Sequence, residues 1–146
     1  MTEMDRLEMA PVGLGDTLRS RRTGKDRVVV GRTGTHWILK GGRRVLRGSV
    51  GRSALDGGHL FRVAVGPNRF PVAIRPLVGG QTGHGDRWVV EWSDGSFLMD
   101  YGPTRQWMDL DAAARAFLAW TPGSNAPVVW ADRPLNPGVE RWVPRS

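Results

Sequence analysis

Cysteine is absent from this chain of 146 residues, and lysine and tyrosine are scarce, with two lysines and one tyrosine. The lack of cysteine excludes a disulfide framework, thiolate ligands for zinc and a cysteine nucleophile, and it is typical of a reducing compartment. No apolar run approaches the roughly 18 residues that cross a bilayer. Residues 1–10 also lack the basic and apolar regions of a signal peptide. We therefore expect a cytoplasmic protein without a membrane partner.

Sequence motifs of the common enzyme classes are missing as well. The chain has no phosphate-binding loop, no dinucleotide-binding fingerprint and no Gly-x-Ser-x-Gly elbow. Its three histidines, His36, His59 and His84, lack the paired spacing of a transition-metal site. We therefore expect no cofactor, and we favour a binding protein over an enzyme.

Basic residues are concentrated in the first half of the chain. Up to Arg75 there are 15 Lys and Arg against 6 Asp and Glu, whereas the remainder has 6 against 8. Between Thr17 and Arg52 there are 11 basic residues and a single acid, Asp26. This asymmetry indicates an acidic partner for one face, with DNA or RNA as the first candidate. The preference for Arg over Lys carries less information, because a GC-rich genome also produces it.

Short β-strands are predicted over most of the chain, at residues 28–30, 36–40, 43–47, 60–65, 70–74, 87–92 and 97–101. Gly41-Gly42 predicts a tight hairpin turn. The strands on either side of residues 66–68 are expected to pair with each other. Because Pro71 and Pro76 lack backbone donors, the second of these two strands is expected at a sheet edge.

One helix is predicted in the second half of the chain. Asp109 is a good N-cap, apolar residues follow at helical spacing, and Pro122-Gly123 ends the segment. Large apolar side chains of the strands and of this helix are expected to supply most of the core, and the candidates are Trp37, Trp88, Trp92, Phe97, Leu110, Phe117 and Leu118.

The first third of the chain resembles a known class of small barrels. Residues 15–18 (Gly-Asp-Thr-Leu), the turn at 22–25, the strand at 28–31 and the turn at 42–44 are similar to small SH3-like barrel modules. The similarity is to the KOW-like type and to small actinobacterial or phage proteins with this opening pattern. The resemblance implies a barrel that binds nucleic acid or protein, and it implies no particular ligand.

Together these observations predict an α+β fold that is mostly β. We expect an SH3-like barrel, then a β-hairpin and one C-terminal helix, then an extended proline-rich tail that packs on its own domain or on a partner. The chain is predicted to form a single domain over residues 1–146. Its parts are a loose arm, a basic barrel-like half, a hairpin with the helix, and the tail, over residues 1–13, 14–77, 86–121 and 122–146.

Basic side chains on one sheet face are the candidate nucleic-acid-binding residues. Alternation places Trp37 and Leu39 on one face of their strand and His36, Ile38 and Lys40 on the other. Cations on such a face grip phosphates while an aromatic ring stacks on a base. The alternative is a solvated charged surface with the tryptophan in the core. The candidates are Arg19, Arg21, Arg22, Lys25, Arg27, Arg32, Lys40, Arg43, Arg44, Arg47 and Arg52.

A second resemblance concerns residues 56–60 (Asp-Gly-Gly-His-Leu) and 68–71 (Asn-Arg-Phe-Pro). These stretches are similar to motifs of non-specific DNA/RNA endonucleases of the ββα-metal type. The resemblance implies that His59 is the general base and that Asn68 is a ligand for a divalent cation. The alternative is a Gly-Gly turn that leads into the following strand.

Three functions are therefore considered. The first is a non-catalytic nucleic-acid-binding module that uses the arginine-rich β face. The second is a protein-interaction or inhibitor module of a mobile element or phage, with an acidic protein as its partner. The third is a small metal-dependent nuclease with His59 as the base.

Overall fold

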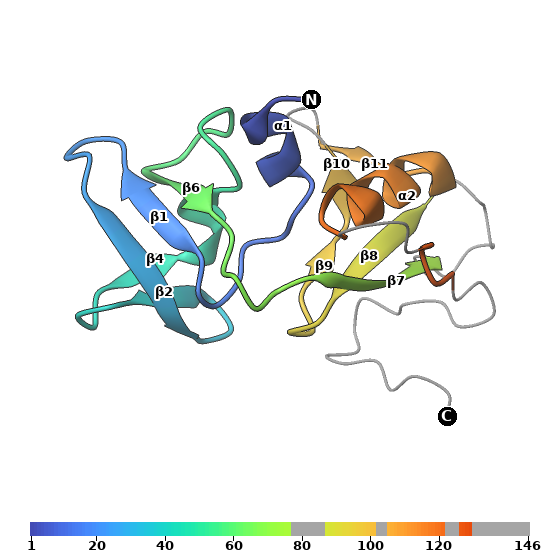
Figure 1. Ribbon diagram of the computed structural model, residues 1–146. Coiled ribbons are helices and arrows are strands. Elements are labelled where there is room, and N and C mark those ends of the chain that lie inside the picture. Colours follow the sequence, from blue (N-terminus) through green and yellow to red (C-terminus); the bar gives the residue numbers. More distant parts are fainter. Residues whose placement is uncertain (77–86, 102–104, 122–125, 130–146) are drawn as a thin grey trace. The chain divides into compact units, whose positions relative to one another are not determined.

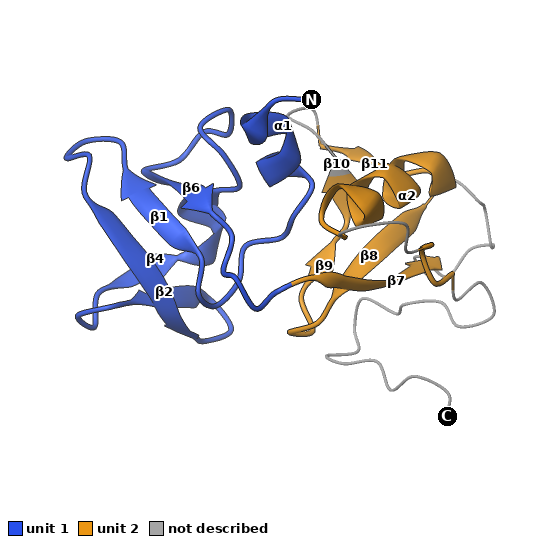
Figure 2. Ribbon diagram, viewed as in Figure 1, with its two compact units in different colours: residues 1–69 blue, residues 70–146 orange. Residues whose placement is uncertain are grey.

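The structure is a computed structural model of the chain. It divides into two compact units, unit 1 with residues 1–69 and unit 2 with residues 70–146 (Figures 1 and 2). The sequence alone predicts a single domain over residues 1–146, and this stays a prediction. β-strands outnumber helices in both units, in agreement with the predicted α+β, mostly β fold. The residues that the structure describes are 1–76, 87–101, 105–121 and 126–129.

Unit 1 contains one short helix and a six-stranded sheet. Its elements are α1 (Glu3–Glu8), β1 (Thr17–Ser20), β2 (Asp26–Arg32), β3 (His36–Leu39), β4 (Arg44–Leu46), η1 (Arg47–Ser49), β5 (Val50–Gly51) and β6 (Leu60–Ala64). The strand order is β4-β3-β2-β1-β6-β5, with antiparallel neighbours except for the parallel pair β5–β6. Among the described residues, no strand pairing closes this sheet into a barrel.

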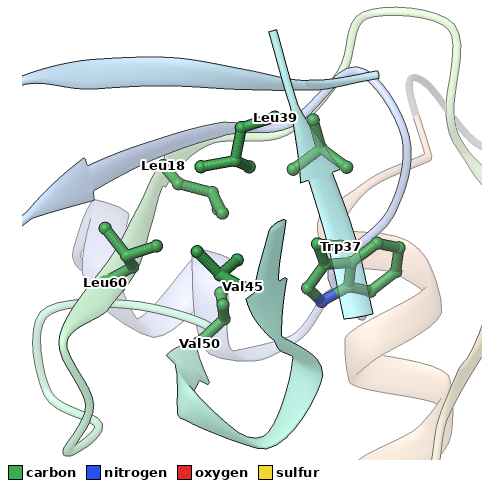
Figure 3. Packing of buried hydrophobic residues seen from close by; sticks show 7 residues of the cluster. Leu18, Trp37, Leu39, Val45, Val50 and Leu60 are labelled. Carbon is green, nitrogen blue, oxygen red and sulfur yellow. The ribbon is translucent and has the colours of Figure 1, made fainter. Parts of the chain in front are cut away.

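The core of unit 1 lies on the inward face of this sheet. Burial along β3 alternates, so that Trp37 and Leu39 point inward, which confirms the predicted alternation. Leu18 of β1, Val45 of β4 and Leu60 of β6 gather with them from the neighbouring strands (Figure 3). The side-chain period of two thus places at least one apolar residue from each strand in a common cluster, and β3 contributes two.

The N-terminal segment is built into unit 1 and is not the loose arm that the sequence predicts. Thr2 caps α1 through a reciprocal capping box with Asp5. Leu7 of the helix and Met9 and Ala10 after it are buried. The segment therefore covers part of the sheet.

Unit 2 contains a three-stranded sheet, a two-stranded ribbon and one helix. Its elements are β7 (Pro71–Pro76), β8 (Trp88–Trp92), β9 (Phe97–Leu98), β10 (Asp100–Tyr101), β11 (Gln106–Trp107) and α2 (Leu110–Ala119). The order β7-β8-β9 places the proline-bearing strand at one end of its sheet, as predicted. An isolated bridge joins Ile74 on its outer side to Val129.

Helix α2 begins as predicted but packs through smaller side chains than expected. The Asp109 carboxylate accepts a hydrogen bond from the Ala112 N–H at 2.7 Å, which completes the N-cap. The predicted core residues Trp88, Trp92 and Phe117 are buried, but Leu110 and Leu118 are exposed. The prediction was wrong for these two leucines because the buried face of the helix consists of three alanines and one phenylalanine, namely Ala112, Ala113, Ala116 and Phe117.

The predicted pairing of strands 60–65 and 70–74 is wrong. β6 pairs with β1 and β5 in unit 1, whereas β7 pairs with β8 in unit 2. The turn at residues 66–69 does not connect two paired strands. Gly66 N–H and the Arg69 side chain both bind Asp16, so the chain leaves unit 1 here instead of folding back on β6.

Most of the predicted tail, residues 122–146, lies outside the described residues, as does the glycine-rich stretch 78–85 with His84. Within the part of the chain that is described, neither helix is long and apolar enough to cross a membrane.

Candidate nucleic-acid interface

Three of the predicted cations lie where the inward-facing columns of unit 1 continue beyond the apolar core. On β2 the column that contains buried Val29 continues to Arg27, and Lys25 follows in the same column just before the strand begins; Leu18 pairs directly with Arg27. At the start of β4, the Leu39 N–H donates to the Arg43 carbonyl, so Arg43 lies opposite a core residue. At this end of the sheet, the inward-facing positions carry cations, whereas the equivalent positions in the core carry apolar side chains.

These cations surround a hollow of about 160 Å³, which we call the cationic hollow. Three core leucines form its floor, and three cations and two hydroxyl side chains form its wall. The lining residues are Leu18, Ser20, Thr23, Lys25, Arg27, Leu39, Arg43 and Leu60. None of them is a carboxylate, so its charged lining has a single sign.

The turn between β3 and β4 positions Arg27. Arg27 donates a hydrogen bond from Nη1 to the carbonyl of Lys40, with an N–O distance of 3.4 Å. Gly41 has φ of +97°, and a Cβ at this position would lie 3.5 Å from the same Nη1 atom. Gly42 also has a positive φ, of +90°, so the predicted Gly-Gly turn requires both glycines.

Two hydroxyl groups of the hollow are oriented by the turn after β1. Ser20 Oγ accepts from the Thr23 N–H at 3.2 Å, and Thr23 Oγ1 accepts from the Lys25 N–H at 3.3 Å. A hydroxyl that accepts in this way still has its own proton to donate. The hollow therefore offers hydroxyl donors beside its cations.

A second, more open hollow of about 470 Å³ lies on the outer side of β1 and β2. Arg27 contributes to it, together with Val28, Lys40, Gly41, Thr17 and Asp26. Asp26 brings a carboxylate, which lowers the attraction of this hollow for phosphate. We therefore place the candidate interface at the cationic hollow.

Several of the remaining predicted cations are occupied within the protein. Arg19 forms a bidentate ion pair with Asp26, in which Nε and Nη2 donate to the two carboxylate oxygens at 2.8 and 3.0 Å. Arg21 donates to the carbonyls of Ala54, Asp56 and Gly58, and its guanidinium lies over the Phe61 ring. These contacts hold the 54–58 loop.

Two more predicted cations belong to the protein's own packing. Arg47 lies over the buried Trp37 ring, 4.7 Å from its centroid. Burial lowers the Arg47 pKa, and the nearby charge of Arg32 lowers it further. Arg52 is buried, and its Nη2 lies 3.8 Å from a carboxylate oxygen of Glu8. The predicted cations therefore fall into three groups: those that line the hollow, those that pack within the protein, and those that are exposed elsewhere. The last group consists of Arg22, Arg32, Lys40 and Arg44.

The other end of the same inward face is closed by a buried ionic cluster. Asp16 is fully buried and accepts hydrogen bonds from Arg62 and Arg69, at 2.7–2.9 Å. It also accepts from the N–H groups of Gly13 and Gly66. Burial lowers the Arg62 pKa to about 10, which leaves the guanidinium charged at neutral pH. Asp16 thus supports both arginines by charge and hydrogen bonds.

Arg62 also holds the N-terminal segment. Its guanidinium donates to the carbonyls of Leu7, Ala10 and Pro11 at 2.5–2.6 Å, and Arg69 donates to Pro11 as well. The Arg69 guanidinium passes so close to Gly13 that a Cβ there would lie 2.5 Å from it. These arginines are therefore structural and unavailable to a ligand.

The predicted nuclease residues do not form a metal cluster in the described part of the chain. The side chains of His59 and Asn68 are exposed, and the His59 carbonyl accepts a hydrogen bond from the Arg21 N–H. Across the described residues, no group of three or more His, Asp or Glu side chains has a metal-binding arrangement. The Gly57-Gly58 turn leads directly into β6, which is the alternative considered above.

Ser20 and Thr23 were not among the site residues predicted from the sequence. The alternation Leu18-x-Ser20 points to Ser20, because a small polar residue occupies an inward-facing position at the end of β1. Thr23 had no comparable pattern, since its place depends on how the turn closes onto β2.

Comparison of the chain with protein-family models, with curated proteins and with solved structures finds no match.

Proposed function

We propose that unit 1 is a non-catalytic nucleic-acid-binding module that holds phosphate groups at the cationic hollow. The observation that carries this proposal is the lining itself, in which Lys25, Arg27 and Arg43 converge with two hydroxyl groups and no carboxylate. Arginine side chains match phosphate oxygens in a forked geometry, and lysine adds a point charge.

The surroundings of the hollow support the same proposal. Exposed Lys40 lies in the turn after β3, and its carbonyl accepts a hydrogen bond from Arg27 of the hollow. The only acid between Thr17 and Arg52, Asp26, is bound to Arg19. A cationic surface of this kind attracts a polyanion over several ångströms and binds it through released counterions.

The strand arrangement is consistent with the proposed architecture. β1 lies between β2 and β6, so the last long strand of unit 1 returns to pair with the first. This return supports our proposal that unit 1 belongs to the SH3-like class of small binding modules.

A titration at two salt concentrations tests the proposal. The full chain is titrated against a labelled DNA duplex and a labelled single-stranded RNA at about 50 and 200 mM salt, and against poly-glutamate as an acidic polypeptide. We expect binding to nucleic acid that weakens steeply with salt, because each phosphate contact contributes a slope of about −0.7 to −0.9. Tight binding to poly-glutamate alone would favour the acidic-protein alternative, and no binding to either nucleic acid at low salt would overturn the proposal.

A further inference from the structure

We propose that the outer face of β2, β3 and β4 docks an acidic segment of another protein, one that carries aliphatic side chains among its Asp and Glu residues. This face lies on the side of the sheet opposite to the core. Its aliphatic and cationic residues are different from those that line the cationic hollow, so the inference is independent of the proposed function.

Aliphatic side chains occur on the outer face of three neighbouring strands. On each strand they are adjacent in sequence to residues of the core, so the side-chain period of two directs them to the opposite face. They are Val28 and Val30 of β2, Ile38 of β3 and Leu46 of β4. We call these four residues, together with Lys40 and Arg44, the outer patch.

Strand register brings these side chains together. β2 has a bulge between residues 29 and 31, in which Val30 is the extra residue and Gly31 pairs with Ile38. A Cβ on Gly31 would lie 3.4 Å from Ile38 Cδ1, so the glycine leaves room for the Ile38 side chain beside Val30. Leu46 pairs with His36, which is two residues from Ile38 on the same face. The aliphatic residues therefore form one patch across the three strands.

The outer patch presents apolar surface to solvent. Val28, Val30 and Leu46 are 36, 55 and 57% exposed, and Ile38 is half-buried. Single exposed aliphatic residues are common on protein surfaces, but a contiguous apolar patch is typical of an interaction site. A partner that covers these side chains removes their surface from water, which favours binding.

Cations border the aliphatic residues of the patch. Lys40 lies beside Val28, since the Lys40 N–H donates to the Val28 carbonyl at 2.8 Å, and Arg44 pairs with Ile38. Both cationic side chains are exposed. The charge that complements this patch is therefore negative.

The surroundings of the patch favour a protein over nucleic acid. The open hollow of about 470 Å³ adjoins the patch, because Val28 and Lys40 line it, and Asp26 and Thr17 add a carboxylate and a hydroxyl to the same lining. The carboxylate repels a phosphate backbone, and phosphates bring no apolar group to cover the aliphatic side chains. A peptide segment supplies both carboxylates and aliphatic groups, so it matches both parts of the patch.

A second copy of this chain matches the patch less well. Asp26 on this face is already bound to Arg19, at 2.8 and 3.0 Å, so it is not free to meet Lys40 or Arg44 of another molecule. Two copies joined through this face would also bring like charges together. The occupant that these contacts support is therefore a segment of a different protein.

Fluorescence anisotropy of the full chain with three labelled random copolymers tests this inference. A copolymer of Glu and Leu samples many spacings of the two side chains, so a failure to bind does not reflect one unsuitable sequence. A copolymer of Glu and Ser with the same charge lacks the aliphatic groups, and a copolymer of Lys and Leu reverses the charge. We expect the Glu–Leu copolymer to bind about tenfold more tightly than either control, a difference of about 1.4 kcal/mol.

Matched variants locate the binding surface. Leu46→Ser and Val30→Ser each remove exposed aliphatic surface, and we expect each to weaken binding of the Glu–Leu copolymer several-fold. Leu55→Ser is the matched control for the leucine, because Leu55 is exposed in the same unit outside the patch. Arg44→Glu should weaken binding more than Arg22→Glu, which makes the same change of charge at an exposed turn. Thermal unfolding verifies that each variant is folded.

Several results would overturn the inference. Equal affinities for the Glu–Leu and Glu–Ser copolymers would show that charge alone explains binding, and absence of binding to both would show that the patch is no docking surface. Binding that is unchanged in folded Leu46→Ser and Val30→Ser would place the partner elsewhere. A dimer of the protein alone that Leu46→Ser dissociates in sedimentation would assign the patch to a second copy. Loss of nucleic-acid binding in folded Leu46→Ser would assign the patch to nucleic acid instead.

Discussion

The two ends of the inward face of unit 1 use the same residue type for opposite purposes. At one end Arg62 and Arg69 are buried against Asp16 and the carbonyls of the N-terminal segment. At the other end Arg27 and Arg43 border a hollow whose lining has no carboxylate. The two ends differ in what covers the inward-facing side chains. The N-terminal segment and its carbonyls cover Arg62 and Arg69, whereas Arg27 and Arg43 border an open hollow.

This comparison shows why a count of basic residues overstates an interface. Arg52 and Arg21 belong by sequence to the basic segment, but the structure uses them to hold Glu8 and the 54–58 loop. A guanidinium whose donors are mostly taken by internal acceptors has little hydrogen-bonding capacity left for a ligand.

Removing the carboxylate at the buried end is expected to have the largest effect. Asp16→Ala removes the acceptor that Arg62, Arg69 and two backbone N–H groups share. We expect the free energy of unfolding of unit 1 to fall by about 3–5 kcal/mol, the usual consequence of breaking a buried ionic cluster. Urea unfolding followed by tryptophan emission measures it. Asp109→Asn, which changes an acid at an exposed cap in unit 2, is the control. A loss below 1 kcal/mol would show that Asp16 does not hold this end together.

Unit 2 offers a buried pair that is separate from the proposed interface. Glu91 accepts from Arg75 at 2.7 and 3.0 Å, and both side chains are buried. Glu91→Ala should lower the free energy of unfolding of unit 2 by about 3 kcal/mol. We expect the affinity of the folded variant for oligo-dT to be unchanged, as measured by anisotropy, because no residue of the cationic hollow is affected. Asp111→Asn on α2 is the control, and a large loss of affinity in folded Glu91→Ala would place part of the interface in unit 2.

Glu8 gives the buried end a predictable pH dependence. Burial raises the Glu8 pKa above its ordinary value of 4.5, and this effect exceeds the attraction of Arg52. The folded state therefore favours the protonated carboxyl, and stability is lost as the pH rises from about 4.5 towards the raised pKa. Glu8→Gln should remove this decline and be more stable than the wild type at neutral pH, with little difference near pH 4. Urea unfolding across this pH range measures both profiles, and parallel profiles would contradict the assignment.

The smallest effect is expected from the exposed Arg19–Asp26 pair. Hydrogen bonding to Arg19 lowers the Asp26 pKa, so the carboxylate is ionised at neutral pH. Asp26→Asn removes a negative charge beside the interface and releases Arg19. We expect stability to change little, because exposed pairs are screened by solvent, and affinity for nucleic acid to rise by about twofold. Anisotropy at low salt detects this change, and a loss of affinity would show that Asp26 takes part in binding.

The sequence supported the positions of most strands and the N-cap of α2, because alternation, Gly-Gly and Asp109 are local features. It could not show that residues 60–64 and 71–76 belong to different sheets, because strand partners are set by contacts distant in sequence. The same limit applies to the interface. Arg62 and Arg27 both occupy inward-facing positions, and only the tertiary structure shows that one is covered and the other is open.

The most direct test of the central claim compares two triple variants that lose the same charge. One removes the wall of the hollow, by Lys25→Ala, Arg27→Ala and Arg43→Ala. The other removes exposed cations of the same unit outside it, by Arg22→Ala, Arg32→Ala and Arg44→Ala. The measurement is the salt dependence of single-strand binding by the folded proteins. We predict that the slope of the first variant falls by about 2, from about 0.7 for each lost phosphate contact, and that the slope of the second changes much less. Equal changes in the two variants would contradict a binding site at the hollow and would leave only a diffuse positive surface.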